Sequence, residues 1–428
     1  TADTTIRDVN FFESIENITV LNNTVALEID REHKIVKTQN LQNKRMSELP
    51  YDVLILATGS ESFVPKIPGI WQKGIYSLNN LEQADAIKIA LSFEKTQDVS
   101  IIGGGLMGIS AAESLIEPGL RVTILEERPH ILFNLMDQNI AIKIQHELRK
   151  KGVKIITKLN IAKIERVKEH LLIMTTENDA YYADLMILAT DLKPNTVLAK
   201  QAGLEIGDTG GIRVSGSLQT TDEHIYAVGN CAESINPITK KHEYWPLGSI
   251  STKMGRIAAD NICGRQPEFR GSIGTVMFKI IDINVARTGL TLKGARENGF
   301  DAEAVIVSGL DRAHYYDNAK NIVLKVMADR KTKVLLGAQG YGKGEIVSRI
   351  QLLACAITQS LTLDDMFNLD LGYAPAFNTS LDIAQTACLV LKNKIEKLIK
   401  TITVEKFEQE QDRIRGIIDV SPFTEHTF

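Results

Sequence analysis

The strongest constraint on the fold of this chain is a run of three glycines between an apolar strand and a helix. Val99–Ile102 is predicted to be a short buried strand, and it runs directly into Gly103, Gly104 and Gly105. The spacing of the apolar residues that follow predicts a helix over about residues 106–117. A strand, a glycine turn and a helix in this order open a βαβ unit, so we expect a parallel sheet.

The alternation of strands and helices continues after this turn. Arg121–Leu125 alternates and contains β-branched residues, as strands do, whereas Asp137–Gly152 places apolar residues at helical spacing. Val153–Ile156 then predicts another strand. Elements that alternate in this way predict an α/β fold with a doubly wound parallel sheet.

The glycine turn fits the pattern GxGxxG. Gly103 permits the tight turn, Gly105 lets the backbone approach a pyrophosphate, and Gly108 allows the helix to pack closely. Glu126 ends the next strand, eighteen residues after Gly108. A carboxylate there accepts hydrogen bonds from the ribose hydroxyls of a dinucleotide. The motif and its surroundings therefore predict a dinucleotide-binding site.

Glu126 also bears on the choice of dinucleotide. Its carboxylate favours NAD, because it bonds the ribose diol and would repel a 2′-phosphate. Arg128 lies two residues further on and is an alternative partner for the phosphate of NADP. A solvated surface charge is the more ordinary role for such an arginine, so we expect NADH.

A second strand and turn resemble each other within the chain. Residues 51–59, which end in Ala57, Thr58 and Gly59, are similar to residues 182–191. Each stretch is followed closely by a proline, Pro65 or Pro194. Two such units about 130 positions apart predict two related, Rossmann-like nucleotide-binding domains.

The pattern changes after a predicted linker at Gly264–Gly271. Four short runs with strand character come first, followed by two predicted helices over about residues 344–359 and 379–397. The strand runs are Thr275–Ile280, Ala304–Val307, Ile322–Met327 and Val334–Leu336. Strands followed by helices predict a separate α+β domain.

Composition excludes several classes of partner. The net charge of -4 gives no basic surface for nucleic acid or for an anionic membrane, and no apolar run is long enough to span a bilayer. The four cysteines, Cys231, Cys263, Cys355 and Cys388, form no CxxC pair and have no metal-ligand spacing. We therefore expect buried structural thiols in a reducing compartment, the cytoplasm.

These motifs together resemble the pyridine nucleotide-disulfide oxidoreductases. The resemblance rests on Gly103–Gly108 with Glu126, Ala57–Gly59, Pro194-Asn195 and Ile225–Gly229. Further segments are most similar to the branch that contains coenzyme A-disulfide reductases, NADH oxidases and NADH peroxidases. Those segments are Ala286–Leu290, Gly337–Gly340, Arg349-Ile350 and Tyr373–Phe377. The resemblance covers roughly residues 10–397.

The resemblance implies three domains and two cofactors. FAD would lie in a domain made of residues 1–75 and 196–268, NAD(P)H in residues 76–195, and a homodimer interface in residues 269–398. Hydride would pass to the flavin, and electrons would then pass to a cysteine or its mixed disulfide. The implied cofactor-binding residues are Ala57, Thr58, Gly59, Gly103, Gly104, Gly105, Gly108, Glu126, Asn195, Gly229 and Asn230.

The resemblance also implies that a tyrosine of one subunit lies near the redox cysteine of its partner. Tyr373 fits that role, and Tyr316 or Tyr315 is a candidate for a second tyrosine. A phenol can hydrogen-bond a thiolate or donate a proton to a leaving thiol. The alternative for each is an ordinary core tyrosine with a satisfied hydroxyl.

Three residues depart from the family pattern at functional positions. Ser110 stands where a glutamate is usual, and Asn230 replaces an aspartate that contacts the flavin's ribityl and phosphate region. Asp191 replaces a turn glycine, so it adds a Cβ and a charge where we expect a tight backbone. These departures bring activity into question more than fold.

Both ends of the sequence also differ from the family. Nothing upstream of Phe11 resembles the βαβ unit that holds the FAD pyrophosphate, and no cysteine here matches the redox position. Residues 399–428 resemble the opening of a rhodanese domain, with Ser421 where an arginine is usual.

Three functions remain open from the sequence. The first is reduction of a small thiol-linked substrate, such as a coenzyme A disulfide or a persulfide. The second is an NADH oxidase or peroxidase, which passes electrons to oxygen or peroxide. The third is a nucleotide-binding relative without a redox centre, which Ser110, Asp191 and Asn230 favour modestly.

The glycine motif yields a direct test. Replacing Gly105 with a bulky residue should push the backbone away from the pyrophosphate and abolish NAD(P)H binding, as measured by calorimetry. Retained affinity would show that the motif does not hold the cofactor.

Overall fold

The glycine turn follows the middle strand of a five-stranded parallel sheet. The computed structural model describes residues 8–92, 96–116, 119–402, 406–407 and 410. The sheet has the order β6–β13–β7–β8–β9, and every neighbouring pair is parallel. Its strands are β6 (Ile75–Ser77), β7 (Asp98–Ile102), β8 (Arg121–Leu125), β9 (Lys154–Ile156) and β13 (Leu185–Leu188). The predicted α/β fold is confirmed.

Amphipathic helices pack against this sheet. They are α2 (Leu81–Leu91), α3 (Leu106–Ile116) and α4 (Gln138–Lys150). Helix α4 buries Ile140, Ile144 and Leu148 on one face, as the helical period requires. These side chains share a core with Ile101 and Ile124 of the sheet, which are fully buried.

A small antiparallel sheet extends the same part of the molecule. Its strands are β10 (Ile161–Val167), β11 (His170–Thr175) and β12 (Ala180–Ala183). Leu171 and Ile173 form a cluster with Leu125 and Met186 of the parallel sheet, and Ile70 belongs to that cluster. Residues just before the expected domain boundary at 76 are therefore held by the NAD(P)-binding side.

The other nucleotide-binding half contains a parallel pair of strands, β4 (Leu54–Leu56) and β15 (Ile225–Ala227). Around it lie β1 (Thr24–Asp30), β2 (Ile35–Asn40), β3 (Met46–Pro50), β16 (Ser234–Ile235), β17 (His242–Glu243), α1 (Val9–Ser14), α5 (Val197–Gln201), the 3₁₀ turn η1 (Gly229–Cys231) and α6 (Gly248–Ile262). Among the described residues β4 pairs with β15 alone, and Val53 and Ile55 are exposed. One edge of this pair is open.

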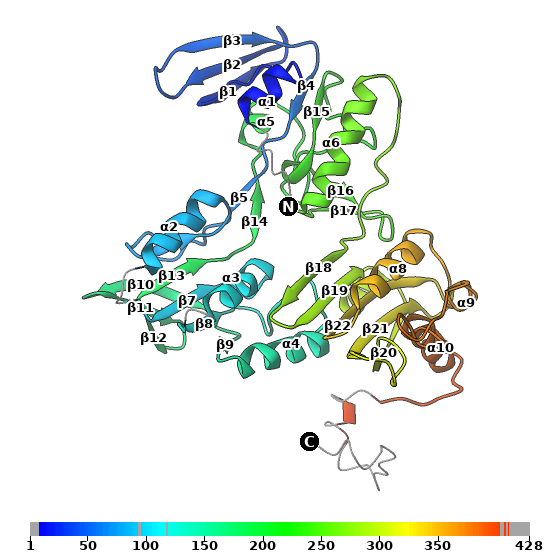
Figure 1. Ribbon diagram of the computed structural model, residues 1–428. Coiled ribbons are helices and arrows are strands. Elements are labelled where there is room, and N and C mark those ends of the chain that lie inside the picture. Colours follow the sequence, from blue (N-terminus) through cyan, green and yellow to red (C-terminus); the bar gives the residue numbers. More distant parts are fainter. Residues whose placement is uncertain (1–7, 93–95, 117–118, 403–405, 408–409, 411–428) are drawn as a thin grey trace.

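Two adjacent strands connect the halves (Figure 1). β5 (Ser60–Ser62) leaves the first unit and pairs antiparallel with β14 (Leu192–Pro194), which returns from the second. The two similar segments, residues 51–59 and 182–191, therefore lead directly into the paired strands β5 and β14, which form one crossing between the halves. The antiparallel register places the Gly59 turn beside Asn195 and the Asp191 turn beside Phe63, at opposite ends of the paired strands.

The C-terminal part is an α+β domain, as predicted. Its antiparallel sheet has the order β18–β19–β22–β21–β20. The strands are β18 (Val276–Ile280), β19 (Ile283–Gly289), β20 (Ala302–Leu310), β21 (Asn321–Asp329) and β22 (Leu335–Gly342), and the helices are α7 (Leu292–Glu297), α8 (Val347–Thr358), α9 (Leu363–Phe367) and α10 (Ile383–Ile395). Helices α8 and α10 pack on this sheet.

Several expectations need correction. Strand β19 was not predicted, because Ala286 and Arg287 interrupt its run of β-branched residues, although both are buried. Cys231 and Cys388 are buried as expected, but Cys263 and Cys355 are exposed. Cys263 directly follows helix α6, and Cys355 lies in the last turn of helix α8. The expectation that all four cysteines are buried is therefore wrong for these two.

Two further findings concern the remaining predictions. Residues 399–428, which resemble the opening of a rhodanese domain, lie largely outside the described residues. No helix in the described part of the chain is long and apolar enough to cross a membrane.

The parallel sheet and the antiparallel domain share one core and one buried polar network. Ile280, Ile283 and Val285 pack in the same cluster as the helices of the parallel sheet. Asp137, which begins helix α4, pairs with Lys325 at 2.8 Å, and both side chains are buried. These contacts hold the two parts as one body.

Other bonds complete the network around Asp137. The Gln339 side-chain amide donates to Asp137 Oδ2 at 2.9 Å and accepts from the Asp137 N–H at 2.9 Å. The Leu292 N–H donates to Asp137 Oδ1 at 3.1 Å, and Lys325 Nζ also donates to Asn139 at 3.1 Å. The carboxylate is therefore satisfied from several directions.

Removing this carboxylate should destabilise the protein strongly. Asp137→Ala leaves the Lys325 ammonium buried without a counter-charge, which typically costs about 3–5 kcal/mol of unfolding free energy. Asp98→Ala is the matched control, because the Asp98–Arg121 pair is exposed and should contribute no more than about 1 kcal/mol. Urea unfolding of both variants measures the difference. Similar losses for the two would contradict the assignment.

Candidate active site

The three glycines at the fixed positions of the motif, Gly103, Gly105 and Gly108, have different surroundings in the structure. Gly103 has a φ of +107°, and a Cβ there would lie 2.4 Å from the Ala189 carbonyl oxygen. A Cβ at Gly108 would lie 1.9 Å from the Gly103 carbonyl oxygen. Both positions exclude a side chain, as expected for the tight turn and for close helix packing.

Gly105 differs because it faces open space. A Cβ there would have no atom within 4 Å, so the conformation of the loop does not require a glycine. Helix α3 begins at the next residue, and the free N–H groups of its first turn adjoin this opening. An exposed backbone at a helix N-terminus is suited to an approaching phosphate.

Glu126 accepts a hydrogen bond from the backbone of the glycine loop. Its Oε2 accepts the Gly104 N–H at 2.6 Å and its Oε1 accepts the Arg128 N–H at 2.7 Å, and the side chain is buried. A carboxylate has about four lone-pair sites, so it retains acceptor capacity for ribose hydroxyls. Arg128 pairs with the neighbouring Glu127 at 3.2 Å on the surface.

The first turn and Asn195 form a second group. Thr58 Oγ1 donates to the Asn195 carbonyl oxygen at 2.6 Å, and Asn195 Nδ2 donates to the Thr58 carbonyl oxygen at 3.0 Å. The Asn195 N–H donates to the Gly59 carbonyl oxygen at 3.0 Å. Gly59 has a φ of +67° and faces open space, and Ala57 directly follows strand β4. The predicted residues are therefore brought together across the crossing.

Asn230 completes this group through two hydroxyls. Its Nδ2 donates to Ser60 Oγ at 3.3 Å, and its Oδ1 accepts from Ser251 Oγ at 3.1 Å. Gly229 has a φ of +73°, and a Cβ there would approach Ser251 at 3.3 Å. The amide thus satisfies both of its ends without the charge of the aspartate that the family usually has.

Two residues beside Asn230 escaped the sequence reasoning. Ser60 and Ser251 are hydroxyls without a recognisable motif, so only the fold brings them to Asn230. Burial raises the pKa of the nearby Tyr244 to about 12. Helix α6 begins at Gly248 without a side-chain cap, so its first N–H groups are available to a ligand.

Asp191 does not strain the second turn. Its backbone is not in the left-handed region that Gly59 occupies, and its side chain is exposed. Its carbonyl oxygen accepts the Phe63 N–H at 2.8 Å. The expectation that Asp191 disturbs a tight turn is therefore wrong, because the two similar units differ in conformation at this point. Ser110 is exposed on helix α3.

The tyrosine candidates lie together on the C-terminal domain. Tyr315, Tyr316 and Tyr373 are all exposed, and Tyr373 keeps 50% of its surface accessible. A side-chain hydrogen bond with Tyr315 raises the pKa of Tyr373 above its ordinary value. Tyr315, not Tyr316, is thus the partner of Tyr373 in this structure.

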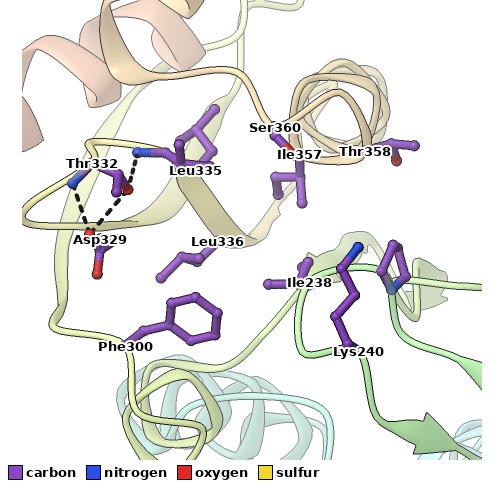
Figure 2. Close-up of a pocket in the computed structure, with 12 residues that line it drawn as sticks. Ile238, Lys240, Phe300, Asp329, Thr332, Leu335, Leu336, Ile357, Thr358 and Ser360 are labelled. Atoms are coloured by element: carbon purple, nitrogen blue, oxygen red, sulfur yellow. Dashed lines mark hydrogen bonds between the residues drawn. The ribbon is translucent and has the colours of Figure 1, made fainter.

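A hollow of about 390 Å³ lies elsewhere, between the turn after β16 and the C-terminal domain. Ile238, Phe300 and Leu336 point into it, with Lys240 at its rim (Figure 2). None of the residues predicted to bind a cofactor lines this hollow. It is separate from the candidate site.

Comparison with known proteins identifies the class. Residues 4–247 match the pyridine nucleotide-disulphide oxidoreductase family, and residues 275–385 match the dimerisation domain of that family. The chain therefore belongs to this family, whose members are FAD-dependent oxidoreductases.

Three named proteins are similar to this chain over most of its length. An NAD(P)H sulfur oxidoreductase (CoA-dependent) from Pyrococcus abyssi is 34% identical over 86% of this chain and 81% of its own length. An NADH oxidase from Methanocaldococcus jannaschii is 31% identical over 84% and 79%. The structure of an NAD-dependent persulfide reductase from A. fulgidus has a TM-score of 0.92 and 36% identity, and the match covers 96% of this chain and 75% of that one.

The position of Glu126 predicts how a substitution should change cofactor choice. Glu126→Gln should weaken NADH binding by roughly tenfold, about 1.4 kcal/mol, because an amide is a poorer acceptor for the ribose diol. NADPH binding should fall less, because the charge that repels the 2′-phosphate is removed. Calorimetry with both cofactors measures this. Glu127→Gln, at the exposed neighbour, is the control, and equal losses for both cofactors would exclude Glu126 as the ribose ligand.

Proposed function

We propose that the protein, loaded with FAD, passes electrons from NADH to a small thiol-linked acceptor such as a coenzyme A disulfide or a persulfide. One observation carries this proposal: residues 189–195 contact both the glycine loop and the turn at Gly59, where the two cofactors are proposed to bind. The Ala189 carbonyl oxygen lies against Gly103 at one end of this segment. The Asn195 N–H bonds the Gly59 carbonyl oxygen at the other end.

The residues present fit a nicotinamide cofactor in the glycine loop. The open backbone at Gly105 and the start of helix α3 suit its pyrophosphate, and Gly103, Gly104 and Gly108 shape that loop. Glu126 suits the ribose diol. The buried carboxylate supports NADH over NADPH, since Arg128 is paired with Glu127 at the surface.

The residues present also fit the flavin end of FAD. Ala57, Thr58, Gly59 and Asn195 line one side of the proposed site, and Gly229 and Asn230 line the other, near the uncapped start of helix α6. The described residues contain one GxGxxG loop, and we assign it to the nicotinamide cofactor. When bound, FAD accepts hydride from NADH and passes two electrons onward.

The balance of the reaction needs a proton. A disulfide receives two electrons and two protons and becomes two thiols; one proton arrives with the hydride equivalent and one comes from elsewhere. We propose that the Tyr373 phenol donates this proton to the leaving thiolate sulfur and is reprotonated by water. The hydrogen bond with Tyr315 raises the pKa of Tyr373, so the phenol stays protonated at neutral pH.

We propose a homodimer in which Tyr373 serves the partner's site. The domain that carries it matches the family's dimerisation domain, and aromatic side chains near it are exposed, Phe377 at 78%. A two-fold interface is self-complementary, so one tyrosine in each chain serves two sites. No nucleic acid or membrane is part of this proposal.

A second function has its own support. The relative from Methanocaldococcus jannaschii is named an NADH oxidase, so oxygen is the alternative acceptor. A non-catalytic role has less support from the site, since Asp191 and Asn230 are accommodated without strain or unmet hydrogen bonds.

Two finer proposals complete the picture. None of the four cysteines is paired, which supports a reducing compartment, the cytoplasm. We also propose that residues 399–428 begin a rhodanese domain, which rests on sequence resemblance alone.

The experiment separates the two half reactions. NADH should bleach the yellow colour of the FAD-loaded protein without oxygen, and coenzyme A disulfide should restore it faster than oxygen does. Tyr373→Phe should slow the second step by at least roughly tenfold, a part of the about 10²–10⁴-fold that a positioned proton donor supplies. The first step should stay unchanged.

Tyr316→Phe is the matched control, because Tyr316 is exposed nearby but is not the hydrogen-bond partner of Tyr373. Reoxidation by oxygen alone would support the oxidase. A flavin that NADH does not bleach would remove the enzyme proposal.

A further inference from the structure

A single buried arginine connects the two loops that carry the tyrosine pair. Arg349 lies on helix α8 with 6% of its surface exposed, and its Nε pairs with Asp382 Oδ2 at 3.0 Å. One terminal nitrogen donates to the Asp311 carbonyl oxygen at 2.9 Å, to the Phe377 carbonyl oxygen at 3.2 Å and to Asn378 Oδ1 at 3.3 Å. Asp311 begins the loop of Tyr315, and Phe377 and Asn378 end the loop of Tyr373.

The guanidinium is itself held firmly. Its other terminal nitrogen donates to the Glu345 carbonyl oxygen at 3.0 Å and to Ser348 Oγ at 3.3 Å. Asp382 also begins helix α10 by accepting the Ala384 N–H at 2.8 Å. Arg349 thus joins the starts of two helices to both loops through the planar fork of donors that only arginine has.

The Tyr315 loop has further bonds of its own, since the Asp311 carboxylate accepts the Lys320 and Glu345 N–H groups, each at 3.0 Å, and pairs with Arg312 at 3.2 Å. One direct backbone bond connects the two loops, from the Ala313 N–H to the Pro375 carbonyl oxygen at 3.3 Å. A hollow of about 330 Å³ lies beneath the Tyr373 loop, lined by Leu352, Leu371, Gly372 and other residues. Arg349 therefore adds hydrogen bonds that connect the Tyr373 loop to the Tyr315 loop.

We propose that Arg349 is a positioning residue that sets the loops 311–316 and 371–378 so that Tyr315 and Tyr373 are presented as a hydrogen-bonded pair. The consequence for turnover rests on the proposed role of Tyr373. The consequence for the tyrosine pair itself does not, because it concerns side chains within one chain.

The first test needs no cofactor. Alkaline absorbance titration of each protein, minus that of its Tyr373→Phe version, follows the Tyr373 phenol together with its effect on Tyr315. Arg349→Lys keeps a charge beside Asp382 but cannot reach both loops. Tyr373 should then titrate at lower pH than in the wild type, because its bond to Tyr315 is lost. Tyr315→Phe should produce the same shift, and combining the two changes should add nothing.

Two further variants serve as controls for this titration. Arg330→Lys changes an exposed arginine of the same domain, paired with Glu303, and should leave the titration unchanged. Asn378→Ala removes one acceptor and keeps the buried ion pair, so it should produce a smaller shift in the same direction. His314, whose ring packs on Tyr315, contributes no phenolate absorbance and does not interfere. An unchanged Tyr373 titration in both Arg349→Lys and Asn378→Ala would overturn the inference.

The second test uses the FAD-loaded enzyme. Arg349→Lys should lower kcat by roughly tenfold, within the range that a positioned proton donor supplies, and leave flavin reduction by NADH unchanged. Its alkaline limit of activity should move to lower pH. If Tyr373→Phe leaves turnover intact, the proposed role of Tyr373 fails while the titration still decides on Arg349. If Tyr373→Phe slows turnover and Arg349→Lys changes neither readout, the inference about Arg349 fails alone.

Discussion

The buried contact between Asp137 and Lys325 is the constraint on which the arrangement of the molecule depends. It joins the start of helix α4 to strand β21, at the point where the parallel sheet and the antiparallel domain share a core. A buried ion pair survives only when other bonds satisfy its remaining groups, and Gln339 and Leu292 supply those bonds. The glycine loop and the tyrosine loops therefore belong to one body, whereas the part of the chain around β4 and β15 is attached through the β5–β14 crossing and its flanking contacts.

That crossing explains why the two nucleotide sites lie close together. The segment formed by residues 189–195 leaves the glycine loop at Ala189 and reaches the flavin turn at Asn195. Gly103 tolerates no added side chain, because the carbonyl oxygen of Ala189 already occupies that space, whereas Gly59 faces open space. Electron transfer between two bound cofactors requires such proximity, and the backbone itself provides it.

Sequence reasoning succeeded where local chemistry determines the structure. The strand–glycine–helix motif was predicted because Gly103 and Gly108 must be glycines for steric reasons that the pattern encodes. It failed where burial comes from distant elements. Strand β19 joins the apolar Ile283 and Val285 to small and polar residues that gain their burial from packed neighbours, and the exposure of Cys263 depends on which face of helix α6 meets the core.

The sequence by itself determined the family and the two Rossmann-like units, and it predicted the residues that bind at each turn, because these depend on short spacings along the chain. The tertiary structure alone decided that Tyr315 pairs with Tyr373, that Asn230 is satisfied by Ser60 and Ser251, and that Arg349 connects two loops. These contacts join residues from separate segments. Hydrogen bonds of that kind form only after folding brings the segments together, so no local pattern announces them.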